Sequence, residues 1–189
     1  MKSLVTLVTL VALLSATPAF AQMNATPARP ATPAGNSAVS TTKMLWSQIT
    51  GYIVKSAEQM PEADYSFRPV ASVRTFGQMI GHVAGAQNLM CGAALGEKTG
   101  NEDDIEKSKT TKADLVAALK ASTEYCKRAY AQSDAATAAT TKLFGQDQTR
   151  LFALALNATH NAEHYGNLVT YMRIKGMVPP SSQPAPAPR

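Results

Sequence analysis

The sequence predicts an all-α protein in which four helices pack as a bundle between two flexible tails. Apolar residues recur at helical spacing in four segments, and no stretch alternates apolar and polar residues convincingly enough to predict a strand. Polar or proline-containing segments separate the four stretches. The chain has 189 residues, which is enough for one domain with a substantial core.

The first two predicted helices cover residues 42–60 and 75–95. Apolar side chains recur along one face of each, and His82 shares the apolar side of the second helix. Pro61 favours a stop after the first helix, and Gly96 is a plausible C-terminal cap for the second. We therefore expect a helical hairpin with an ordered connection.

The other two predicted helices cover residues 112–132 and 148–175, and the last is about 40 Å long at 1.5 Å per residue. A polar connection at residues 96–110 precedes them and carries three consecutive acidic residues, 102–104. These acids could attract a cation, but such a run is more typical of a solvated loop. Residues 134–141 are rich in Ala and Thr and do not favour a particular structure.

The N-terminus, residues 1–21, is predicted to be a secretory signal peptide. Lys2 supplies the charged start, residues 4–14 are mostly apolar, and residues 19–21 form an A-x-A cleavage site before Gln22. The apolar run is short for a membrane span, although an uncleaved anchor is the alternative. We expect a periplasmic or secreted protein with no membrane span after cleavage.

The segments flanking the predicted bundle, residues 22–40 and 179–189, are rich in Ala and Pro and contain few large apolar residues. Such segments cannot bury enough surface to order themselves, so we expect a flexible linker and a flexible tail.

Of the 18 Lys and Arg residues, three lie outside residues 41–178, which leaves 15 basic against 13 acidic residues in the bundle. That near balance argues against a nucleic-acid partner.

The three histidines of the sequence are the candidate metal ligands. His160 and His164 are four residues apart on a predicted helix, so both imidazoles point the same way, one turn apart. His82 lies in a different helix, and three imidazoles would leave coordination positions of a zinc, nickel or iron ion open. The alternative is three unrelated histidines that hydrogen-bond in the core or at the surface.

Glu163 is the candidate catalytic residue, because it lies about 60° around the helix from His160. It could orient a ligand, act as a base, or be a solvated surface carboxylate. The string H-x-x-E-H matches an inverted zinc-protease pattern, but a bundle argues against a protease. The Cys-x-x-Cys-His of c-type haem and the Glu-x-x-His of di-iron bundles are absent. Three further residues either line a pocket or serve packing and the surface: Tyr65, Tyr165 and Asn167.

Three segments resemble the DinB-like (damage-inducible) family of helical-bundle metalloproteins. They are MPEADYSFRP (residues 60–69), RTFGQMIGHVA (74–84) and HNAEHYGNLVTYMR (160–173). The resemblance implies a four-helix bundle with up-down-down-up topology, often dimeric. It also implies a divalent metal, commonly nickel, zinc or iron, on three histidines that match His82, His160 and His164.

The implied topology also predicts a disulfide between Cys91 and Cys126. In an up-down-down-up bundle the second and third helices run parallel, so the two cysteines come level. Export would place both thiols in an oxidising compartment. The alternative is two small buried hydrophobic residues.

Two functions remain open. In the first, the chain is an enzyme, a metal-dependent transferase or hydrolase acting on a small molecule, since relatives in the family include thiol transferases and isomerases. In the second, it is a non-catalytic metal- or ligand-binding or sensory module. A substrate-sized cavity at the metal would favour the enzyme, whereas a closed site or a Glu163 that points to solvent would favour the module.

Overall fold

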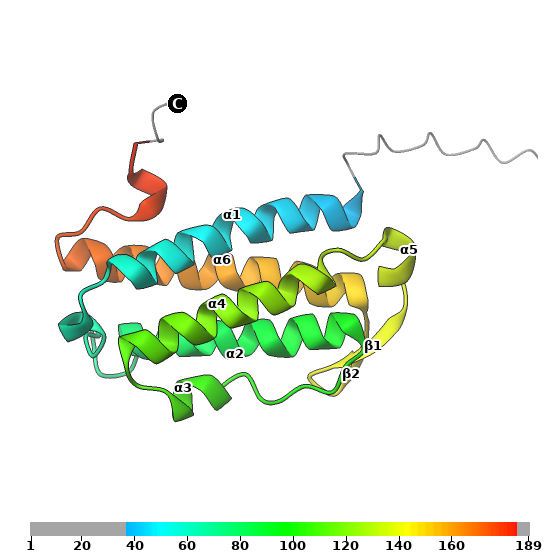
Figure 1. Cartoon of the computed structure of the whole chain (residues 1–189), viewed down its shortest axis with the longest axis horizontal. Helices are drawn as coiled ribbons and strands as arrows, with labels where there is room; N and C mark the ends of the chain where they lie inside the picture. The colour runs from blue at the N-terminus through cyan, green and yellow to red at the C-terminus, as the bar shows by residue number, and fades with distance from the viewer. Residues whose placement is uncertain (1–36, 185–189) are drawn as a thin grey trace, which may run out of the picture. The chain divides into compact units, whose positions relative to one another are not determined.

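Four long helices pack side by side in the computed structural model, which describes residues 37–184 (Figure 1). α1 and α6 run in one direction along the bundle, and α2 and α4 run in the other. This arrangement confirms the predicted all-α, up-down-down-up bundle. The helices span Ala38–Gln59 (α1), Phe76–Leu95 (α2), Lys112–Ala129 (α4) and Arg150–Ile174 (α6).

Side-chain caps fix where these helices begin. Thr75 and Gln78 form a reciprocal capping box at the start of α2, and Gly96 ends that helix in a left-handed conformation with φ of 74°. α1 begins four residues earlier than predicted, inside the expected linker at 22–40. A local cap and a tertiary contact stabilise this start. The Ser37 hydroxyl accepts a hydrogen bond from the amide of Ser40, and the Asp134 carboxylate accepts hydrogen bonds from the first two backbone amides of α1, at 3.1 and 3.0 Å.

A small hairpin between α4 and α6 corrects the expectation of no strands. β1 (Thr140–Leu143) pairs antiparallel with β2 (Gln146–Thr149) through a two-residue turn, in which both Phe144 and Gly145 have positive φ. The strands are mostly polar and exposed, so they lack the alternation that identifies a strand in a sequence. Only Leu143 reaches the core.

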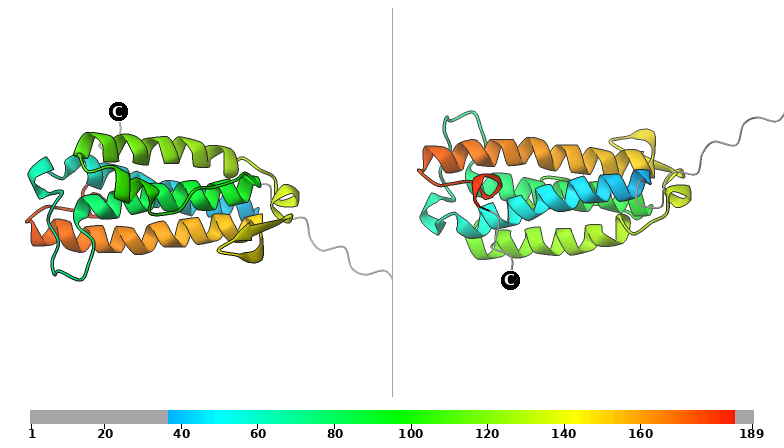
Figure 2. Two further views of the ribbon diagram at one scale, coloured as in Figure 1. Left: turned by 90° about the horizontal axis from the view of Figure 1, so that it is seen from below. Right: turned by 90° about the horizontal axis from the view of Figure 1, so that it is seen from above.

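The chain returns from the end of α2 to the start of α4 along residues 97–110, here called the crossover. It contains a short helix, α3 (Asp104–Ser108), where a polar loop was expected, and it lies over α2 (Figure 2, left). Two glycines of α2 allow this contact: a Cβ on Gly81 would lie 2.8 Å from the Cα of Glu106, and one on Gly85 would overlap the carbonyl oxygen of Glu102.

One buried amide links all four helices. The Gln87 side chain of α2 accepts hydrogen bonds from Trp46 of α1 at 2.9 Å and Asn161 of α6 at 3.3 Å. It donates to Ser122 of α4 at 3.0 Å. Asn161 also donates to Thr50 of α1 at 3.0 Å. Hydrophobic residues surround this network on both sides and form the core of the bundle.

The predicted disulfide between Cys91 and Cys126 is present. It joins α2 to α4 with a Cα–Cα distance of 5.3 Å, and both residues are fully buried. The parallel course of the two helices brings the cysteines level, as the topology requires. The disulfide therefore holds α4, the helix that follows the crossover, against α2.

The predicted tails are only partly described. Residues 1–36, with the expected signal peptide and most of the linker, and residues 185–189 lie outside the described part. The start of the tail at 179–189 is packed rather than free: Pro180 is buried, and the backbone amide of Ser181 donates to the Tyr165 hydroxyl at 2.9 Å.

No helix within residues 37–184 is long and apolar enough to cross a membrane. Four short helices complete the fold: η1 (Glu62–Asp64), α3, α5 (Asp134–Thr137) and η2 (Pro180–Ser182).

Replacing Gln87 with Leu should lower the free energy of unfolding by about 2–3 kcal/mol, because buried donors of Trp46 and Asn161 lose their acceptor. Urea denaturation followed by circular dichroism measures the change. The matched control is Gln48→Leu, the same substitution at an exposed position of α1, which should stay within about 0.5 kcal/mol of the wild type. Equal effects of the two substitutions would contradict the structural role of Gln87.

Replacing both Cys91 and Cys126 with Ala should lower the free energy of unfolding by about 4 kcal/mol, as expected for a closed loop of this length. The sequence separation of the two cysteines is 35 residues. Thermal denaturation of the oxidised wild type and the double variant gives the comparison. Thiol alkylation of unfolded, unreduced wild type is the control, and labelled cysteines would show that the bond does not form.

Candidate metal centre

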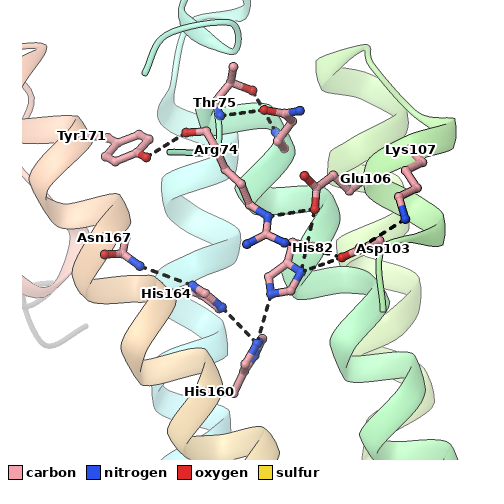
Figure 3. A network of polar contacts seen from close by, with 11 residues as sticks. Arg74, Thr75, His82, Asp103, Glu106, Lys107, His160, His164, Asn167 and Tyr171 are labelled. Carbon is pink, nitrogen blue, oxygen red and sulfur yellow. Dashed lines mark hydrogen bonds and ion pairs between the residues drawn. The ribbon is translucent and has the colours of Figure 1, made fainter. Parts of the chain in front are cut away.

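Three imidazoles from two helices converge on one point between α2 and α6 (Figure 3). The Nε2 of His160 lies 3.2 Å from the Nε2 of His82 and 3.0 Å from the Nε2 of His164. A zinc ion at about 2.0–2.1 Å from three tetrahedrally arranged nitrogens would hold them about 3.3 Å apart. The observed spacing and the nitrogen donor set therefore fit a divalent metal ion.

The local protein environment keeps two of these imidazoles neutral. Burial is the main cause that lowers the pKa of His164 to about 3, and the two neighbouring imidazoles lower it further. Burial, followed by the charge of His82, lowers the pKa of His160 to about 4. Neutral imidazoles have free lone pairs at physiological pH, which a metal ion requires.

Two carboxylates of the crossover face the other nitrogen of His82. The Nδ1 of His82 lies 3.4 Å from an oxygen of Asp103 and 3.8 Å from an oxygen of Glu106. Arg74, just before α2, contacts both acids: its Nε donates to Glu106 at 2.9 Å, and its Nη2 lies 3.5 Å from Asp103. The Lys107 ammonium is the main cause that holds the pKa of Asp103 below its usual value.

Sequence reasoning missed this charged layer. The run at 102–104 was interpreted as a solvated loop, yet the Asp103 side chain is only 32% exposed and faces His82. The only sequence signal was the acidic run itself, which could not reveal that the crossover lies against α2. Arg74 begins the motif at residues 74–84, but that motif did not indicate that its side chain contacts the acidic residues of the crossover.

The other candidate residues are placed outside the centre, with one exception. Glu163 is exposed, and no hydrogen bond or ion pair joins it to the three histidines among residues 37–184. The Tyr65 hydroxyl donates to the Ala57 carbonyl at 2.6 Å, and Tyr65 also lines a hollow beside the starts of α2 and α4, so it serves both packing and a pocket. Tyr165 stacks on Tyr52 and serves packing. Asn167 is the exception, with its side-chain nitrogen 3.4 Å from the Nδ1 of His164.

Neither of two hollows in the described part of the chain is lined by the histidines. One, of about 640 Å³, opens beside the starts of α2 and α4 and is bordered by Thr75, Glu106 and Lys112. The other, of about 400 Å³, lies between α1 and α4 and is bordered by Trp46 and Thr50. Glu106 borders the first hollow and also faces His82, so it is the link between that hollow and the centre.

The sequence matches the family model of the DinB superfamily over residues 46–168, which is more than half of the chain. The chain belongs to the DinB superfamily. The resemblance of the three motifs to this family is thereby confirmed. No curated protein is significantly similar to the chain in sequence.

Solved structures support the DinB fold. A DinB-like protein from Bacillus cereus has a TM-score of 0.63 and 15% identity, with 74% of this chain and 93% of that chain covered. A DinB-like protein from Bacillus subtilis has a TM-score of 0.61 and 20% identity, with 77% and 99% covered. The mycothiol-dependent maleylpyruvate isomerase has a TM-score of 0.55 and 17% identity, with 69% and 59% covered. Similarity at these identities establishes a shared fold and no shared activity.

The stability of the metal-free protein should fall as the pH drops from 6.5 towards 4. In the unfolded chain His160 and His164 take up protons near their ordinary pKa of 6.5, whereas in the folded protein they stay neutral down to about pH 4 and about pH 3. The unfolded state thus binds more protons in this window, so the free energy of unfolding decreases with acid and is unaffected by these groups above it.

The measurement is urea denaturation across this pH range in the presence of a chelator. The double variant His160→Gln/His164→Gln should show a shallower decline between pH 6.5 and 5, since carboxylates contribute mainly below that window. An equally steep decline in the variant would mean that these two histidines are not the source.

Proposed function

We propose that the chain binds one divalent metal ion through His82, His160 and His164, and that it is a metal-dependent enzyme acting on a small molecule. The observation that supports the proposal most directly is the convergence of three Nε2 atoms with separations of 3.2 and 3.0 Å on either side of His160. Zinc, nickel and iron all accept such a set of imidazole ligands.

A metal held by three protein ligands keeps open positions, where it lowers the pKa of a bound water or thiol and makes it a nucleophile at neutral pH. The chain would supply neutral ligands and a nearby positive charge. Neutral His160 and His164 bind without first losing protons, and Arg74 places a positive charge at the edge of the centre. These features favour a transferase, isomerase or hydrolase reaction.

A solved structure with the same fold suggests a reaction class. One protein that shares the fold is a mycothiol-dependent maleylpyruvate isomerase, although this chain covers only 59% of it. A small thiol or thiol adduct is therefore a reasonable first class of substrate.

The disulfide between Cys91 and Cys126 agrees with the export predicted from residues 1–21, and we propose a periplasmic or secreted location.

A non-catalytic metal-binding or sensory module is the second candidate. Two observations favour it: Glu163 is exposed to solvent, and neither described hollow is lined by the histidines. In that case the metal would contribute to stability or capture a ligand. The predicted homodimer is compatible with both functions.

Each single substitution of His82, His160 or His164 by Ala should abolish most metal binding, because two imidazoles rarely hold such an ion tightly. Metal content after loading and desalting, measured by mass spectrometry, reads out the effect. Glu163→Gln is the matched control, since it changes an exposed neighbour of His164 and should retain the metal. Full occupancy in His82→Ala would show that the site on α6 does not extend to α2.

Activity assays separate the two candidate functions. Protein from the natural host identifies the metal, and the protein loaded with that metal is then assayed against thiol adducts and esters. A turnover that disappears on metal removal and returns on reloading would establish the enzyme. If both substrate classes are inert while the metal raises the melting temperature, the module is favoured.

A further inference from the structure

The two ring nitrogens of His82 face different surroundings (Figure 3). Nε2 points to the other histidines, and Nδ1 lies 3.4 Å from the Oδ1 of Asp103. Within residues 37–184, both the Nδ1 of His82 and the Oδ1 of Asp103 are buried without a hydrogen bond that meets strict geometry. The Nη2 of Arg74 also lies 3.5 Å from this oxygen as an ion pair. The Nδ1 of His82 is slightly nearer to the oxygen and has no other hydrogen-bond partner among the described residues, so the carboxylate of Asp103 is its available acceptor.

The charged neighbours favour an acceptor role for Asp103 over a role as metal ligand. His82, Asp103 and Glu106 lie close enough together to be considered a second cation site. However, Arg74 contacts both carboxylates, and Lys107 lies 3.3 Å from the Oδ2 of Asp103. These fixed cations would repel a further ion. Lys107 also lowers the pKa of Asp103, and an ionised carboxylate is a strong acceptor for an imidazole N–H.

Backbone packing holds Asp103 in this position. The crossover contacts α2 where Gly81 and Gly85 flank His82, and side chains at these two positions would overlap the backbone of Glu106 and Glu102. The carboxylate of Asp103 and the imidazole of His82 are therefore positioned by contact between two main chains rather than by flexible side chains alone.

We propose that Asp103 is a positioning residue of the metal centre, one that accepts a hydrogen bond from Nδ1–H of His82. This bond keeps the ring proton on Nδ1, so the lone pair of Nε2 is directed at the metal. The carboxylate also makes His82 a stronger donor to the ion. The inference rests on the proposed metal-binding function and adds the crossover to the centre as a structural part.

The first test compares zinc affinities by competition with a chromogenic chelator. Asp103→Asn should weaken zinc binding by about 10- to 100-fold, the usual cost of losing such a carboxylate partner. Glu102→Gln is the matched control, because it removes the same charge from the neighbouring position, and it should stay within about twofold of the wild type. Unchanged affinity in Asp103→Asn would overturn the proposal. Equal weakening in both variants would also overturn it, because net charge would then be the cause.

The second test needs no metal and no variant. Nitrogen-15 NMR of the imidazole rings in metal-free wild type identifies which nitrogen of His82 carries the proton. The proposal expects Nδ1–H, and a proton on Nε2 would overturn it even if Asp103→Asn fails to fold. A wild type that binds no zinc would instead reject the proposed function, so the two failures are distinguishable.

Discussion

The arrangement of the bundle depends on the buried side chain of Gln87. A buried amide needs all its hydrogen bonds satisfied, and Gln87 finds partners on α1, α4 and α6 at once. Rotating any of these helices about its axis would break at least one bond. Because Asn161 is one of the partners and directly follows His160, the same bond that fixes the rotation of α6 also directs His160 and His164 towards α2.

The crossover positions charged residues beside His82 on the other side of α2. Close contact at Gly81 and Gly85 brings the acidic residues of a polar segment against His82, and Arg74 neutralises part of their charge. Without the glycines, side chains on α2 would hold the crossover away. The centre is consequently built from three layers: the histidine pair of α6, His82 of α2, and the charged residues around the crossover.

Electrostatics divides these layers into a neutral interior and a charged edge. Burial is the main cause of the low pKa of His160 and His164, and the guanidinium of Arg74 contributes further. Arg74 therefore acts in two ways, since it disfavours protonated imidazoles and holds the carboxylates behind His82. A metal ion could bind these neutral imidazoles at neutral pH without competition from protons, which suits an enzyme and a sensory module equally.

Helical periodicity was enough to predict the four helical segments and the pairing of His160 with His164. His82 was a candidate ligand as the one further histidine of the sequence, and the resemblance to a family supported it. The disulfide was predicted from the family's topology. The exposure of Glu163 came from the tertiary structure, in which Asn161, about 200° away around α6, is buried and Glu163 is exposed. The hairpin and the contacts of Arg74 and Asp103 around the crossover were also not predicted from the sequence. Their positions depend on contacts between segments that are distant along the chain, such as the close contact of the crossover with α2. The local spacing of residues in the sequence carries no information about such contacts.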